Sequence, residues 1–238
     1  MRAIFRCSIV IISLVALSSC DNRSESTGTN PLLPTPSPPY AQNSPQNALR
    51  LLEWGYTQKN LDSYRRLFTS DFRFVFSDRD SNGAAYRVVP WTRDDDMIST
   101  NHLFQGGDAD QPVATAIQLA LDRNFLVLPD DRVGKSPRWH VMSTTQLILH
   151  VALADGHTED ITGEAKFYLT RADSAAIPDD LGAPADSTTW YVDRWEDRTV
   201  QGDGSLSRLG PTPTRRASTA GIRAIQYATW GGLKAIYR

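Results

Sequence analysis

The spacing of apolar residues changes along this chain, and that change limits the folds open to it. From residue 44 to residue 68 they recur mainly at three- and four-residue intervals, which is typical of helices with one buried face. After residue 114 they recur at every second position, which is typical of strands. Helices followed by a run of strands predict an α+β domain whose helices pack on one face of an antiparallel sheet.

The helical part carries start and stop signals. Ser44 followed by Pro45 predicts an N-cap and a first helical turn. Asn60 interrupts the apolar pattern, so we expect one helix before it and a second, short helix after it. A third helix is expected over about 92–104.

Three acids occupy the start of that third helix. A negative charge there suits the helix dipole, and three successive side chains point in different directions. We therefore interpret Asp94, Asp95 and Asp96 as a solvated helix start and not as a calcium site. The apolar contacts expected of this helix are Ile98 and Leu103.

Alternation predicts the strands. Phe72, Phe74 and Phe76 fall on every second position, which indicates a half-buried strand. Four later strands are expected, over 115–121, 139–153, 160–171 and 189–199. In the last of these, Trp190 and Trp195 differ in parity, so we expect one in the core and the other at a surface or a pocket mouth.

The first twenty residues resemble the signal sequence of bacterial lipoproteins. Two arginines precede an apolar run at 9–17, which is too short for a comfortable membrane span. The run ends at Leu17-Ser18-Ser19-Cys20, which resembles the lipobox whose cysteine receives an acyl-chain anchor before cleavage. We predict a signal peptide over 1–19, lipidation of Cys20, export, and attachment to the periplasmic face of a bacterial membrane.

Composition divides the rest of the chain. Residues 20–43 begin with the lipidated cysteine and continue as a Pro/Ser/Thr-rich stretch, which we expect to be a disordered tether. Residues 44–200 are long enough for one domain with a real core. Residues 201–238 are expected to be a linker followed by a tail that packs on the domain, through apolar residues at near-helical spacing: Trp230, Leu233, Ile236 and Tyr237.

Charge and motif content exclude several functions. The chain holds 25 Lys and Arg against 27 Asp and Glu, which argues against a nucleic-acid partner. Its two cysteines, Cys7 and Cys20, both lie in the signal segment, so the exported domain has no disulfide and no cysteine metal site. The sequence carries no nucleotide-binding or hydrolase motif, and we predict no cofactor and no metal.

Two segments resemble the NTF2-like or SnoaL-like superfamily. The first is residues 48–74, read as helix, polar break, second helix and Leu67-Phe68-Thr69-Ser70-Asp71-Phe72 leading into a strand. The second is the terminal-strand pattern at 190–197. The resemblance implies a cone: about three N-terminal helices packed on a strongly curved antiparallel sheet, with a cavity between them. The fold hosts enzymes as well as binding domains, so it does not fix an activity.

The resemblance also identifies candidate acid and base residues. Isomerases of the superfamily place a catalytic Asp on the first strand, and the matching position here is Phe76, which cannot take a proton. Asp78 lies near that position, past the expected strand end. His140 and His150 share a face of one strand and are candidates for acid/base work. A cavity lining could also hold an apolar ligand against Met142, Tyr191 or Trp195.

Two hypotheses of function follow. The first is a membrane-anchored lipoprotein whose NTF2-like domain is non-catalytic and binds an apolar small molecule or an envelope protein partner. The second is a SnoaL-like acid/base enzyme, of isomerase, dehydratase or cyclase type, acting on a cyclic apolar substrate. They differ in whether titratable groups converge inside the cone. A homodimer formed through the sheet is compatible with either hypothesis.

Overall fold

The computed structural model describes most of the domain and the C-terminal end. The described residues are 37–78, 80, 83–107, 111–171, 177–181, 188–201 and 229–238. The expected signal peptide, Cys20 and most of the tether and linker therefore lie outside the described residues. None of the helices in these ranges is both long and apolar enough to span a membrane.

Two helices begin the domain and a third follows the first two strands, at the places where the sequence signals helices. Helix α1 spans Pro45–Thr57, and Ser44 caps it by accepting a hydrogen bond from the Asn47 amide. Helix α2 spans Leu61–Arg65 and is capped by the Asn60 side chain. Helix α3 spans Arg93–Gln105, after a capping box formed by Thr92 and Asp95.

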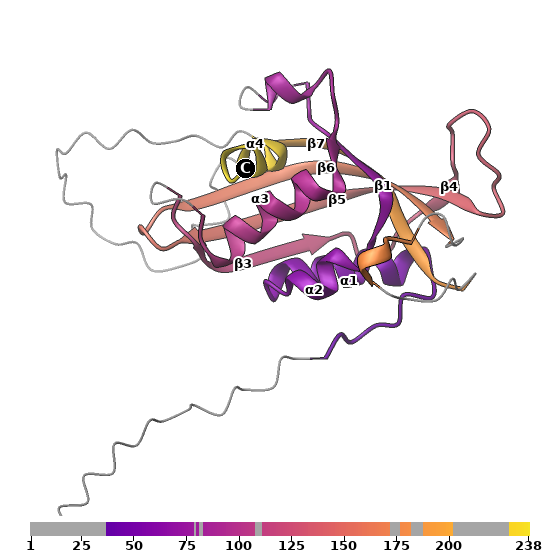
Figure 1. The fold of residues 1–238 in the computed structure, drawn as a ribbon, viewed down its shortest axis with the longest axis horizontal. Helices are drawn as coiled ribbons and strands as arrows, with labels where there is room; N and C mark the ends of the chain where they lie inside the picture. The colour runs from indigo at the N-terminus through magenta and orange to yellow at the C-terminus, as the bar shows by residue number, and fades with distance from the viewer. Residues whose placement is uncertain are drawn as a thin grey trace, which may run out of the picture. The chain divides into compact units, whose positions relative to one another are not determined.

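The strands form one open sheet in the order β2-β1-β7-β6-β5-β3, with β4 pairing with β5 (Figure 1). Their bounds are β1 Phe68–Val75, β2 Trp91–Thr92, β3 Ala114–Leu121, β4 Val127–Pro129, β5 His140–Leu153, β6 Thr158–Arg171 and β7 Trp190–Gln201. All pairs are antiparallel except β1 and β7, which run parallel, so the sheet is not antiparallel throughout. The short strands β2 and β4 carry no alternation from which the sequence could have predicted them.

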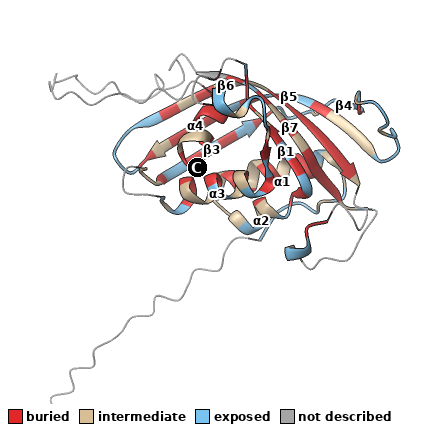
Figure 2. Ribbon diagram, turned by 45° about the horizontal axis from the view of Figure 1, so that its top comes forward, coloured by how far each residue is buried: buried red, intermediate tan, exposed pale blue. Residues whose placement is uncertain are grey.

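The long strands arch over α1 and α3, and the core fills the space beneath them (Figure 2). Along β5 the odd-numbered residues from Ser143 to Leu153 are buried, while Thr144, Gln146 and Ile148 are exposed. The α+β class expected from the sequence is therefore confirmed, with three helices on the concave side of the sheet.

Two packing predictions were wrong. Ile98 is 46% exposed, so α3 buries Leu103 but not Ile98. Trp190 and Trp195 share a face, because the register with β6 shifts at Asp193: Leu169 pairs with Val192, and Tyr168 pairs with Arg194. Because Asp193 is an extra residue at the bulge, side chains an odd number of positions apart across it face the same side of the sheet. Both tryptophans therefore lie in the core.

A fourth helix, α4, spans Trp230–Ile236 and lies beside α3 and β7 (Figure 1). Its side chains at Trp230, Leu233 and Tyr237 are fully buried, and Ile236 is partly buried. Hydrogen bonds from Ser99 Oγ to the Lys234 carbonyl, at 2.7 Å, and between His102 Nδ1 and the Tyr237 carbonyl, at 2.8 Å, join α4 to α3.

Candidate functional site

Titratable groups converge inside the arch of the sheet, where α4 meets α2 and α3. We call Tyr64, Asp96, Thr100 and Lys234 the interior cluster. Tyr64 comes from α2, Asp96 and Thr100 come from α3, and Lys234 comes from α4. The side chains of Asp96 and Lys234 are both fully buried, which identifies this as an ion pair without solvent contact.

The Lys234 ammonium is hydrogen-bonded on all sides. Its Nζ donates to Asp96 Oδ1 at 2.6 Å, to Tyr64 Oη at 3.1 Å and to Thr100 Oγ1 at 3.1 Å. Tyr64 in turn donates its hydroxyl proton to Asp96 Oδ2 at 2.8 Å. Three acceptors match the three protons of an ammonium group, so the buried charge is satisfied.

Aromatic rings surround the same nitrogen. The Lys234 Nζ lies 5.3–5.7 Å from four ring centroids, those of Tyr56, Tyr64, Phe74 and Trp195. Cations within about 6 Å of a ring face are attracted by its quadrupole, most strongly where water is excluded. The rings come from α1, α2, β1 and β7, so four elements of the domain meet at one side chain.

Burial controls the ionisation of these groups. Burial lowers the pKa of Lys234 below its ordinary value, and the negative charge of Asp96 opposes that shift. Burial, followed by the charge of Asp96, raises the pKa of Tyr64 well above its ordinary value. The pKa of Tyr56 is also raised, chiefly by burial. Tyr64 is therefore a proton donor in this site and not a base.

The start of α4 is held by polar groups of β7. Thr199 Oγ1 accepts a hydrogen bond from the Trp230 amide at 2.7 Å, and Asp197 Oδ2 accepts one from the Gly231 amide at 2.8 Å. Trp230 Nε1 donates to Tyr56 Oη at 2.9 Å. These bonds fix α4 at the depth at which Lys234 reaches Asp96.

Gly231 is required by close approach. A Cβ at this position would lie 2.8 Å from Phe76 Cδ1, 3.0 Å from Asp80 Oδ2 and 3.1 Å from Asp197 Oδ2. The same geometry shows that two buried carboxylates flank one backbone position. A larger residue at 231 would force either α4 or these three side chains to shift.

Asp80 and Asp197 are a second pair of buried acids, and neither carboxylate forms a salt bridge with a residue that the structure describes. Burial raises the pKa of Asp197, and the charge of Asp80 raises it further, against hydrogen bonds from Thr199 and Gly231. Asp80 Oδ1 accepts a hydrogen bond from the Gly83 amide, while its buried Oδ2 has no hydrogen-bond partner in the described part of the chain.

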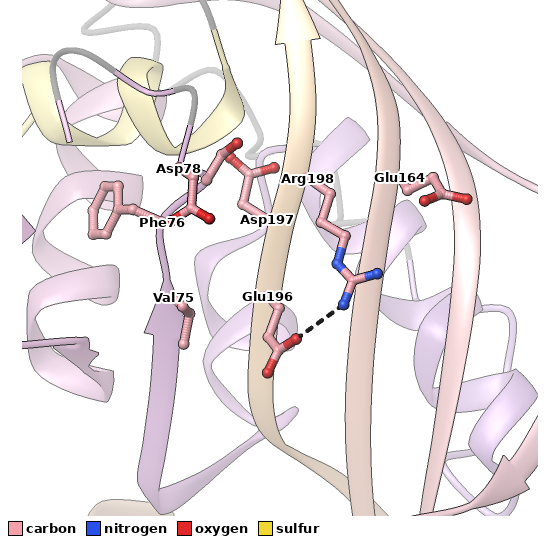
Figure 3. Close-up of a pocket in the computed structure, with 8 residues that line it drawn as sticks. Val75, Phe76, Asp78, Glu164, Glu196, Asp197 and Arg198 are labelled. Atoms are coloured by element: carbon pink, nitrogen blue, oxygen red, sulfur yellow. Dashed lines mark hydrogen bonds and ion pairs between the residues drawn. The ribbon is translucent and has the colours of Figure 1, made fainter. Parts of the chain in front are cut away.

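An open pocket of about 570 Å³ borders this pair (Figure 3). It is lined by Val75, Phe76, Ser77, Asp78, Glu164, Glu196, Asp197 and Arg198. Arg198 Nη2 lies 3.4 Å from Glu196 Oε2, so one cation faces a lining of several carboxylates. A surface of this polarity does not suit an apolar ligand.

Of the predicted catalytic candidates, Asp78 lines this pocket. It is exposed and lies beyond the end of β1. Phe76, at the position matched to the isomerase base, is buried against the rings of Phe74, Tyr86 and Trp91.

The structure does not bring the two histidines together. His140 and His150 share the outer face of β5 and are separated by its length. His150 Nδ1 lies 2.7 Å from Asp160 on the neighbouring strand. His140 lies near Asp130 and Asp193, with ligand atoms within 4.8 Å of one another.

The group of Asp130, His140 and Asp193 already contains a cation. Arg132 forms ion pairs with Asp130 and, at 2.8 Å, with Asp193. A metal ion would have to displace that guanidinium, so the carboxylates do not require one for charge balance.

The predicted ligand-lining residues are dispersed. Trp195 is fully buried in the core, against Phe74, Phe167 and Trp230. Tyr191 is buried with Ile177 in a separate small cluster. Met142 is half-buried on the outer face of β5, where it pairs with β4.

Asp96 corrects the interpretation of the three acids. Asp94 is exposed, and Asp95 closes the capping box, but Asp96 is fully buried. The missed signal was helical spacing, because Asp96, Thr100 and Leu103 stand at i, i+4 and i+7 on one face. A buried acid on that face needs a cation as its partner. Lys234 lies among the apolar residues of the tail and is that partner in the structure.

Comparisons with known proteins give a fold but no activity. No family model matches the chain, and no curated protein matches it significantly. A conserved protein from Planctomyces limnophilus aligns with a TM-score of 0.44 and 13% identity, over 65% of this chain and 91% of that one. An NTF2-like superfamily protein from Salmonella enterica serovar Typhimurium aligns with a TM-score of 0.42 and 10% identity, over 70% and 94%.

An enzyme is also among the similar structures. A hexachlorocyclohexane dehydrochlorinase from Novosphingobium barchaimii aligns with a TM-score of 0.41 and 9% identity, over 65% of this chain and 82% of that one. At such identities the likeness concerns the fold alone, and these scores carry no argument about function.

Proposed function

We propose that this chain is an exported lipoprotein, held by lipid on Cys20 at the periplasmic face of a bacterial membrane, and that its NTF2-like domain is a non-catalytic module that docks an envelope protein. The observation that carries the non-catalytic part is the ion pair between Asp96 and Lys234. The chain itself occupies the interior, where an enzyme of this fold would place its substrate.

The remaining interior acids support the same proposal. Asp197 accepts hydrogen bonds from Thr199 and from the Gly231 amide, so its oxygens are used to seat α4. General acid/base catalysis needs a group within hydrogen-bond reach of a substrate. With α4 in place, Asp96 and Tyr64 face Lys234 instead. The polar lining of the Figure 3 pocket favours a protein partner over an apolar small molecule.

The second candidate is a SnoaL-like acid/base enzyme acting on a cyclic apolar substrate. One observation favours it: a carboxylate, Asp96, and a phenol, Tyr64, meet inside the domain at 2.8 Å. In that function Asp96 would be the base and Tyr64 the proton donor. Such an enzyme would be inactive for as long as Lys234 holds Asp96.

An isomerase assay separates the two candidates. The purified full chain is mixed with a β,γ-unsaturated ketosteroid, and Asp96→Asn and Asp78→Asn are assayed beside it. We expect no turnover by any of the three proteins, because neither acid can approach a bound substrate while Lys234 and water hold them. Turnover that either substitution abolishes would overturn the non-catalytic proposal.

Membrane fractionation tests the anchor. Cys20→Ala should move the protein from the membrane fraction to the soluble fraction, because acyl chains contribute roughly 0.8 kcal/mol per buried methylene group. Cys7→Ala is the matched control and should leave the distribution unchanged. A Cys20→Ala protein that is correctly processed and still bound to membranes would show that something other than lipid on this cysteine anchors the chain.

A further inference from the structure

Lys234 contacts the interior of the domain as a bound ligand would, through groups that other elements supply. Every group that contacts its ammonium belongs to the body of the domain, between residues 56 and 195, and none belongs to α4. Lys234 itself comes from a segment that is separated from β7 by residues 202–228. The receiving groups are therefore supplied by α1, α2, α3 and the sheet, and not by the helix that carries Lys234.

The receiving groups are specific for an ammonium. Asp96 supplies the charge, and Asp96, Tyr64 and Thr100 together supply one acceptor for each of three N–H bonds. Four ring faces within 6 Å favour a positive charge over a neutral group of the same shape. A guanidinium is planar and carries five donors, so it does not match three converging acceptors.

The access route favours a straight chain. The Lys234 side chain is 0% exposed, and its nitrogen reaches Asp96 at a point 5.4 Å from the ring centroids of Tyr64 and Phe74. The backbone of α4 is fixed by Thr199 and Asp197, so only the four-carbon stem and the ammonium occupy this space.

We propose that the interior cluster is a binding site for an unbranched primary ammonium group, and that the chain fills it in cis with Lys234 of its own C-terminal helix. The domain is thereby held in an occupied state that excludes external ligands of the same class. The proposal is independent of the membrane anchor and of whether the domain is catalytic.

Chemical rescue tests the site in the full chain. Lys234→Ala removes the three methylene groups and the nitrogen beyond Cβ, which together have the shape of n-propylammonium. The melting temperature of this variant should rise by several degrees in n-propylammonium chloride at about 100 mM, since a ligand that binds only the folded state stabilises it. n-Propanol has the same heavy-atom count without the charge, and equal sodium chloride controls for ionic strength. Neither should reproduce the rise.

Matched variants complete the test. The wild-type chain should not respond, because Lys234 already occupies the site, and Lys234→Met should not respond, because its side chain fills the space. Lys234→Ala combined with Asp96→Asn should lose the rescue, because the counter-charge is gone. If Lys234→Ala folds poorly, its refolding yield with and without n-propylammonium becomes the readout. Equal effects of n-propylammonium and n-propanol, or no effect of either, would overturn the proposal.

Discussion

Two clusters of this domain pair a cation with buried aspartates, but only one of the two cations is fully buried. The interior cluster holds Lys234 against Asp96 with both side chains fully buried. At the far end of β5, Arg132 pairs with Asp130 and Asp193, stacks 4.2 Å over the Tyr168 ring and remains 25% exposed. We call Arg132, Asp130 and Asp193 the outer cluster.

The difference lies in what each charge loses when its partner is removed. In the outer cluster the carboxylates of Asp130 and Asp193 are also buried, but Arg132 is partly exposed, so its removal would admit water, and Lys135 already lies 3.9 Å from Asp193. In the interior cluster no water is at hand, so an orphaned charge must stay buried or neutralise. The interior pair therefore stabilises α4 strongly in its observed position. The outer cluster stabilises only the end of a strand.

The largest effect is expected from Lys234→Met. It keeps the length and apolar bulk of the side chain but leaves Asp96 buried without a cation. Breaking a buried pair in this way costs about 3–5 kcal/mol of unfolding free energy. Denaturant unfolding monitored by tryptophan fluorescence measures it.

A double substitution shows whether charge or packing is lost. Lys234→Met combined with Asp96→Leu should recover most of the loss, because buried ion pairs are often replaced by apolar residues at little cost. A single Lys234→Met that costs less than about 1 kcal/mol would contradict the contrast between the two clusters.

Arg132→Ala should cost less, about 1–3 kcal/mol, because the guanidinium is 25% exposed and its removal opens the two buried carboxylates to water. Burial alone would raise the pKa of Asp130, but the hydrogen bonds from Arg132 hold it below its ordinary value of 3.8. The stabilisation is therefore present above that pH and is lost as the pH falls. Urea unfolding of wild type and variant should differ at pH 7 and converge as the pH falls below 3.8. A difference that persists at low pH would assign the effect to the stacking on Tyr168.

Glu159 on β6 is a buried acid that forms no ion pair with a lysine or an arginine of the described residues. Burial raises its pKa from 4.5 to about 7. The folded state then binds a proton that the unfolded state has lost, so unfolding free energy falls as the pH rises from 4.5 to 7. Glu159→Gln should flatten this slope and stabilise the protein at pH 8 by about 1–2 kcal/mol, after allowance for its partial solvation. An unchanged slope in thermal melts would contradict this assignment, and Glu164→Gln on the same strand is the control.

The smallest effect is expected at the exposed pair of Arg238 and Asp95, next to the end of α4. Exposed ion pairs are worth about 0–1 kcal/mol, because water screens them and the side chains lose freedom. Arg238→Ala should therefore shift the melting temperature by no more than a degree or two, despite its proximity to Lys234. A loss comparable with that of Lys234→Met would mean that the last residue, and not the buried lysine, holds α4 in place.

Local signals in the sequence determined much of the fold. The Ser44-Pro45 start and the Asn60 break depend on backbone groups within three or four residues, so α1 and α2 could be predicted from them. Period-two alternation depends on which side of a strand meets the core, and it located β3, β5, β6 and β7 to within two residues. The α+β class follows from these elements and their order.

The sequence could not predict which face of β7 each side chain occupies beyond the bulge. The bulge at Asp193 shifts every later residue of β7 to the other face, and it is stabilised by pairing with β6 and not by any residue pattern of its own. This is why Trp195 is in the core with Trp190, and why neither lines a mouth.

The pairing in the interior cluster was decided by tertiary structure. Asp96 and Lys234 stand 138 residues apart, and the helical spacing that places Asp96 on the face of Leu103 does not identify its partner. Neither burial is favourable without the other, because an unpaired charge in a dry interior costs several kcal/mol. The sequence determined that helices and an alternating sheet would form around an apolar core. Only the folded chain, by closing α4 over α2 and α3, could make a buried ammonium and a buried carboxylate favourable together.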